Sequence, residues 1–165
     1  MNKTVEFYLR NVIFGISDSL VSTVGLLSGI DASGTTRQVV LLTGIIYAFV
    51  EAFSMAVGSF LSEESAEQYE SKTAATGNQP FIGGVIMFIS FVLASFIPIV
   101  PYMFLSITAA LRLSIVLSIL ALFIVGIVSA RLAHINLFQQ AIKTTLLGGA
   151  AIVIGVIVGK FVKVG

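Results

Sequence analysis

Long, nearly unbroken runs of apolar residues alternate with short polar segments along the whole chain. A helix of about 20 apolar residues, rising about 1.5 Å per residue, crosses the roughly 30 Å hydrocarbon core of a membrane. The runs are continuous and lack the period-two alternation of membrane barrel strands, so they predict helices. The predicted membrane-spanning helices cover residues 11–30, 39–61, 81–105, 106–130 and 144–162.

The third and fourth predicted helices come from one long stretch without charge, between Lys72 and Arg112. Pro98 and Pro101 near the end of this stretch, followed by Ser106 and Thr108, predict that the third helix ends at about residue 105 and that a tight turn leads into the fourth. The second helix is expected to continue outside the membrane over residues 62–72. The sequence therefore predicts an all-α integral membrane protein, with residues 1–165 forming a single transmembrane domain of five helices.

The composition supports this class and excludes others. The chain is 57% hydrophobic and 10% charged, whereas soluble domains carry roughly 25% charged residues. A net charge of +1 leaves no basic patch for nucleic acid. The absence of cysteine and the presence of one histidine exclude disulfides and multi-histidine metal centres. His134 is assigned to a loop. The usual enzyme motifs are absent, so we expect no catalytic site and no bound cofactor.

Five spans place the two ends of the chain on opposite sides of the membrane. Asp18 interrupts the apolar run that could be mistaken for a cleaved signal peptide, so we expect a retained first helix. A cytoplasmic N-terminus puts five basic residues inside and four outside, which weakly favours that orientation in the cell membrane. The inside residues would be Lys3, Arg10, Lys72, Arg131 and Lys143.

Two carboxylates, Asp18 and Glu51, lie inside predicted spans. Each costs about 2.5 to 3.5 kcal/mol at the centre of a membrane helix, so such residues are kept mainly where they pair, face water or bind something. No Lys or Arg lies deep in any span, so the counter-charge must be a proton, a metal cation or a substrate. The alternative is a pair of protonated, hydrogen-bonded packing residues.

Helical spacing places each carboxylate on a stripe of small and polar residues. Bulky apolar residues lie behind each stripe, where they suit lipid or packing. The stripe of the first helix contains Asn11, Gly15, Asp18, Ser22, Gly25 and Gly29, opposite Ile13, Ile16, Leu20, Val24 and Leu27. The stripe of the second contains Gly44, Ala48, Glu51, Met55, Gly58 and Ser62, opposite Ile46, Phe49, Phe53, Val57 and Phe60.

Counting residues along the two helices places Asp18 and Met55 at similar depth and Glu51 one turn deeper, so the three form a candidate metal site. Two oxygen ligands and one thioether suit Fe²⁺ or Mn²⁺ better than Ca²⁺ or Mg²⁺, although a methionine alone is more commonly core filling. Outside the membrane, acidic residues lie within about 60° on one face of the second helix. They predict either a solvated face or an acidic antechamber that gathers cations. These residues are Glu63, Glu67 and Glu70, with Glu64 to one side.

Gly155 and Gly159 form a GxxxG pair in the last span. This spacing permits close packing of helices, either within the chain or across a dimer.

Three segments of the chain resemble the vacuolar iron transporter family, whose members exchange Fe²⁺ or Mn²⁺ for protons. They are RNVIFGISDSLVST at residues 10–23, SMAVGSFLS at residues 54–62 and FIPIVPY at residues 96–102. Residues 126–132 and 143–149 match the closing motifs of the family more loosely. The chain has Tyr47 where the family often has its second-helix acid, and Ser59 where many bacterial members have Glu.

The resemblance implies that Asp18 and Met55 line an ion path at a homodimer interface. It also implies a short form of the family, since the segment between the second and third helices is too short for a cytoplasmic metal-binding domain. We therefore expect a homodimeric, proton-coupled exporter of Fe²⁺ or Mn²⁺. The alternatives are a membrane scaffold or assembly protein without transport, and a passive cation channel; a membrane enzyme ranks last.

Overall fold

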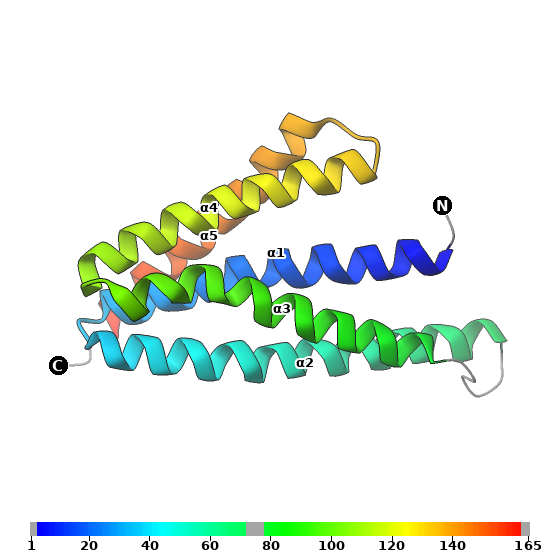
Figure 1. Ribbon diagram of the computed structural model, residues 1–165, viewed down its shortest axis with the longest axis horizontal. Coiled ribbons are helices and arrows are strands. Elements are labelled where there is room, and N and C mark those ends of the chain that lie inside the picture. The colour runs from blue at the N-terminus through cyan, green and yellow to red at the C-terminus, as the bar shows by residue number, and fades with distance from the viewer. Residues whose placement is uncertain (1–2, 72–77, 163–165) are drawn as a thin grey trace.

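The computed structural model describes residues 3–71 and 78–162. Within these residues the chain folds into five helices, each long and apolar enough to cross a membrane, as Figure 1 shows. The prediction of an all-α protein with five spans is thereby confirmed. The helices are α1 (Lys3–Ala32), α2 (Arg37–Ser71), α3 (Gln79–Phe104), α4 (Ile107–Leu132) and α5 (Leu137–Phe161).

Two helices begin about two turns earlier than the predicted spans. The helix α1 begins at Lys3 rather than Asn11, and α5 begins at Leu137 rather than Thr144. The prediction follows the apolar runs, whereas a helix continues into water wherever its polar turns remain hydrogen-bonded. At α5 the start is fixed by Asn136, whose side-chain Oδ1 accepts a hydrogen bond of 3.1 Å from the Gln139 backbone N–H.

The helix α3 continues through Pro98 and Pro101 and ends at Phe104, one residue before the end predicted for the third helix. Both proline rings are buried, and membrane helices tolerate proline where neighbouring helices pack around the missing hydrogen bonds. The Leu105 N–H donates to the Pro101 carbonyl at 3.0 Å and closes the helix. The expected tight turn into α4 follows directly. His134 lies in the turn between α4 and α5 with a φ of 55°, which confirms its assignment to a loop.

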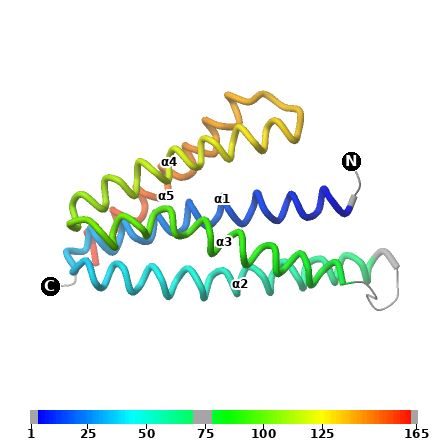
Figure 2. Tube along the Cα trace, viewed as in Figure 1, coloured from blue at the N-terminus to red at the C-terminus, as the bar shows by residue number. Residues whose placement is uncertain are grey.

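Each helix runs antiparallel to the one before it, and α1 lies between the α2–α3 pair and the α4–α5 pair (Figure 2). We call the end of the bundle where α1 begins and α2 ends the proximal end, and the opposite end the distal end. The α4–α5 pair diverges from α1 toward the proximal end (Figure 1). The helix α1 begins at the proximal end and α5 finishes at the distal end.

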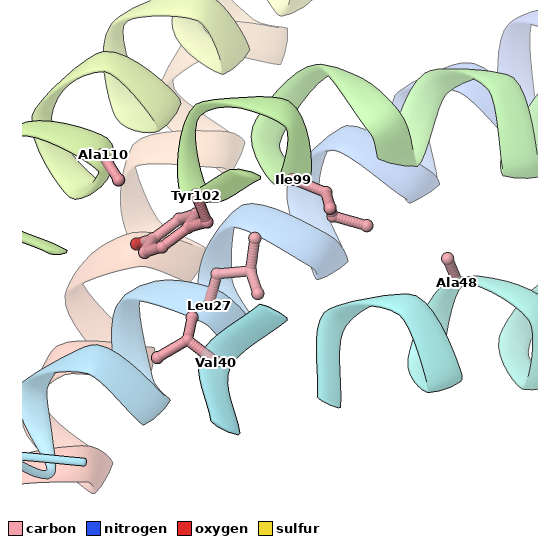
Figure 3. Close-up of a cluster of buried hydrophobic side chains, with 6 residues drawn as sticks. All are labelled: Leu27, Val40, Ala48, Ile99, Tyr102 and Ala110. Atoms are coloured by element: carbon pink, nitrogen blue, oxygen red, sulfur yellow. The ribbon is translucent and has the colours of Figure 1, made fainter. Parts of the chain in front are cut away.

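The distal half of the bundle holds a buried apolar cluster, shown in Figure 3. Its largest member, Tyr102, is fully buried, and its hydroxyl donates to Asp31 Oδ2 at 3.3 Å. A second cluster of Leu20, Ala94 and Leu122 lies nearer the middle. Leu20 and Leu27, both on the bulky face of α1, are thus buried by packing rather than by lipid. The cluster in Figure 3 consists of Leu27, Val40, Ala48, Ile99, Tyr102 and Ala110.

Glycines hold α1 and α5 in close contact. A Cβ placed on Gly29 would lie 2.8 Å from the Gly155 carbonyl oxygen, and one on Gly159 would collide with the Gly29 carbonyl oxygen. The GxxxG pair of α5 therefore packs within the chain, against Gly25 and Gly29 of α1, and is not free to pair with a second copy. The small residues predicted to share one stripe of α1 therefore do not all face α2, since Gly25 and Gly29 meet α5.

A candidate cation path between helices α1 and α2

Two pockets lie along the junction of helices α1 and α2. The first, the proximal pocket, has a volume of about 560 Å³. The second, the distal pocket, has a volume of about 650 Å³ and includes one side of α5. The proximal pocket is lined by Phe7, Arg10, Asn11, Phe14, Ser54, Met55, Gly58, Ser59, Ser62, Glu63 and Met87.

Asp18 and Glu51 lie between the two pockets and within electrostatic range of each other. Both side chains are half-buried. Asp18 is one turn after Phe14 of the proximal pocket and one turn before Ser22 of the distal pocket. Neither carboxylate forms an ion pair with any basic residue in the described part of the chain. Two like charges this close repel, so a cation or a proton between them is stabilising.

Tyr47 and Ser22 add hydroxyl groups on the distal side of the acid pair. The Tyr47 hydroxyl lies near Ser22 and in electrostatic range of both carboxylates. The Ser22 hydroxyl donates to the Asp18 backbone carbonyl at 2.6 Å. Both residues line the distal pocket, which is otherwise mostly apolar. The polar groups thus continue from the acid pair into the distal pocket.

Met55, one turn after Glu51, lines the proximal pocket and is partly buried. It therefore borders the side of the acid pair that faces the proximal end. Met87 of α3 lines the same pocket and is 3% exposed. No sequence pattern indicates Met87, because its place depends on which helix packs beside α1 and at what rotation.

An ion pair stands at the proximal pocket. Arg10 Nη2 lies 3.6 Å from Glu63 Oε2, with the Arg10 side chain 72% exposed and Glu63 20% exposed. The guanidinium also lies over the Phe7 ring, 5.6 Å from its centroid. Glu63, predicted as part of an acidic antechamber, is therefore partly neutralised by Arg10. Arg10 itself could have been suspected from its position two turns before Asp18.

The other acidic residues predicted for the antechamber follow Glu63 along α2. Glu67 is partly buried on the same helix. The Glu70 side chain lies outside the described residues. In the described part of the chain, no three His, Cys, Asp or Glu side chains gather closely enough to hold a metal ion. Within residues 3–71 and 78–162, a single copy thus has no preassembled carboxylate cage.

A hydrogen-bonded bridge joins α1 and α2 beside the proximal pocket. The Ser59 hydroxyl donates to Asn11 Oδ1 at 2.7 Å, and Asn11 Nδ2 donates to the Phe7 carbonyl at 3.0 Å. Asn11 is buried. This bridge joins the two helices on the proximal side of the acid pair.

Five helices suited to a membrane, with two carboxylates inside the apolar body, define a multi-pass membrane protein. The model of the VIT family matches residues 9–79 and 70–160. The chain belongs to this family, in agreement with the resemblance of its motifs to the vacuolar iron transporters.

Two relatives illustrate the range of similarity. The chain is 22% identical to "Vacuolar iron transporter 1" of Eucalyptus grandis, over 87% of this chain and 82% of that protein. It is 40% identical to "Vacuolar iron transporter homolog 4" of Arabidopsis thaliana, over 41% of this chain and 33% of that protein. The chain thus spans about a third of the second relative and most of the first.

Proposed function

We propose that this protein carries a divalent metal ion, Fe²⁺ or Mn²⁺, across a membrane through the junction of α1 and α2. The observation that carries the proposal is the pair Asp18 and Glu51, two membrane carboxylates within electrostatic range of each other and without a basic partner among the described residues. Membership of the VIT family and relatives named as iron transporters support the same substrate class.

The ion would enter at the proximal pocket, which we propose faces the cytoplasm of the cell membrane. It would pass Glu63, bind the acid pair with the Met55 thioether, and leave through the distal pocket beside Ser22 and Tyr47. Metal and proton compete for the same carboxylate oxygens, so each lowers the affinity for the other. A proton gradient would in this way drive export of the metal.

We propose further that two copies form the complete path. The exposed side of α2 next to the acid pair is apolar, with Val50 63% and Leu61 51% exposed. A Cβ added to Gly58 would have no neighbour within 4 Å among the described residues, so another helix can approach there closely. A second copy against this face would double the carboxylates around one ion and would compensate for the missing cage in a single copy.

Uptake into proteoliposomes tests the proposal. The purified protein is reconstituted, and entry of Mn²⁺, or of Fe²⁺ without oxygen, is followed with and without a pH gradient. Proton-coupled transport predicts uptake that depends on the gradient. A passive channel predicts equal uptake without it. A scaffold predicts no uptake above protein-free vesicles, and either of these two results would overturn the proposal.

Replacing Arg10 by glutamine is expected to raise the initial rate of cation uptake at low ionic strength. The change removes a positive charge beside Glu63 at the proximal pocket, while the exposed ion pair contributes at most about 1 kcal/mol to stability. An electrostatic change of at most about 1 kcal/mol corresponds to a rate increase of at most about fivefold. The increase should shrink as salt screens the charge. Initial rates at low and high ionic strength measure this.

The matched control is Arg112→Gln, an exposed arginine near the start of α4 at the distal end. It should leave the rate and its salt dependence unchanged. A slower Arg10→Gln variant, or an increase that does not depend on salt, would contradict entry beside Glu63.

A further inference from the structure

Another pocket opens between α1 and α4 at the proximal end, where the α4–α5 pair diverges from α1 (Figure 1). We call it the wedge pocket; its volume is about 450 Å³. Its walls are mostly apolar, with Leu9, Ile13 and Phe14 on α1 and Leu132 and Ala133 at the end of α4. A gap with apolar walls inside a bilayer is filled by lipid chains, because water there would lose its hydrogen bonds.

The turn between α4 and α5 places this end of the bundle at the level of the lipid headgroups. Ile135 is 52% exposed and Phe138 is 67% exposed, and the basic residues Arg131 and His134 beside them are exposed too. Exposed apolar and basic side chains together are typical of the boundary between the hydrocarbon core and water. The wedge pocket reaches Ala133 just before this turn, so it extends from the hydrocarbon core into the headgroup region.

The charged residues that line the wedge pocket, Glu6 and Arg10, both lie on α1. They are one helical turn apart, about 6 Å along the helix at about 1.5 Å per residue. A glutamate four residues before a basic residue favours an ion pair between the two. Here Arg10 instead lies 3.6 Å from Glu63 of α2, and Glu6 has no ion pair with any basic residue in the described part of the chain. The Glu6 carboxylate therefore remains available to a cation in the wedge pocket.

Arg10 can bind an anion in the wedge pocket without leaving Glu63. Its guanidinium has five N–H donors, whereas the ion pair with Glu63 engages Nη2 and leaves the side chain 72% exposed. Arg10 also lines both the proximal pocket and the wedge pocket. The wedge pocket thus presents a cationic donor and, one turn farther from the membrane interior, an anionic acceptor.

We propose that the wedge pocket binds one phospholipid with a primary ammonium headgroup, phosphatidylethanolamine. The order of residues along α1 matches the order of groups along this lipid: Ile13 and Phe14 face an acyl chain, Arg10 the phosphate and Glu6 the ammonium. A purely anionic headgroup would leave Glu6 without a counter-charge, and a choline headgroup has no N–H to donate to it. The site does not depend on the proposed transport.

Lipid binding to the purified full-length protein in detergent tests the headgroup. Phosphatidylethanolamine, phosphatidylcholine and phosphatidylglycerol with identical acyl chains are added separately to delipidated protein, and native mass spectrometry counts the lipids bound per chain. We expect one phosphatidylethanolamine per chain, bound about two- to fivefold more tightly than either other lipid, as is typical of an exposed charge pair. Equal binding of the ethanolamine and choline lipids, tighter binding of the glycerol lipid, or no retained lipid would overturn the proposal.

Matched variants locate the site. Glu6→Gln should abolish the preference for the ethanolamine lipid over the choline lipid, whereas Glu64→Gln, on α2 outside the wedge pocket, should keep it. Ser129 lines the wedge pocket, so the ring in Ser129→Phe should fill it and weaken binding of all three lipids. Asp18→Asn, which tests transport, should bind lipid like the wild type. A preference that survives in Glu6→Gln, or unchanged binding in Ser129→Phe, would refute the site whatever the transport result.

Discussion

Asp18→Asn is expected to lower metal uptake by about a hundredfold or more, because it removes one of the two carboxylates that hold the ion. Asparagine has nearly the same size and keeps an amide oxygen, so the fold should survive. Removing the charge also removes an insertion cost of about 2.5 to 3.5 kcal/mol, so stability should not fall. The measurement is the initial rate of Mn²⁺ uptake into proteoliposomes, together with the melting temperature in detergent.

The other aspartate of α1 provides the matched control. Asp31 lies at the distal end and accepts a hydrogen bond from Tyr102 rather than facing Glu51. Asp31→Asn should therefore transport close to the wild-type rate. If Asp18→Asn transports like the wild type, or if both variants lose uptake equally, the assignment of the path to Asp18 is wrong.

Gly159→Ala is expected to have the largest effect on stability, a loss of about 1 to 3 kcal/mol or more. Its Cβ would collide with the Gly29 backbone carbonyl, and a backbone atom moves only if the helix moves. The result should be separation of α1 from α5. Thermal unfolding in detergent, followed by circular dichroism, measures the change.

Gly149→Ala on the same helix is the control for helix propensity. Its added Cβ would meet no atom of the described residues within 4 Å, and alanine is the better helix former by about 0.8 to 1 kcal/mol. This variant should be as stable as the wild type or slightly more so. Equal stability of the two variants would show that the glycine contact does not hold the helices together.

The membrane-spanning helices can be predicted from the sequence because the thickness of the hydrocarbon core sets their length. An apolar run that crosses the hydrocarbon core is visible without knowledge of its neighbours. The starts of α1 and α5 are different, since their first turns are polar and depend on local hydrogen bonds such as the Asn136 cap. The path of α3 through Pro98 and Pro101 depends on packing around both rings, which local propensity does not report.

The candidate site, like the fold, is only partly predictable from the sequence. Asp18 and Glu51 stand out because a carboxylate in a membrane is costly wherever it lies. Met87 and the partnership of Arg10 with Glu63 arise from which helices adjoin and how they are rotated. The stripe on α1 illustrates the limit: helical spacing groups its small residues together, but Gly25 and Gly29 meet α5 while Ser22 meets Tyr47 of α2.

The location of a bound metal ion tests the central claim most directly. Crystals of the protein grown with Mn²⁺, measured at a wavelength where manganese scatters anomalously, would locate the ion without any assumption about transport. The proposed path predicts an anomalous peak beside the carboxylates of Asp18 and Glu51, with Met55 adjacent. A peak confined to the acidic end of α2, at Glu63 or Glu67, with none beside Asp18, would contradict it.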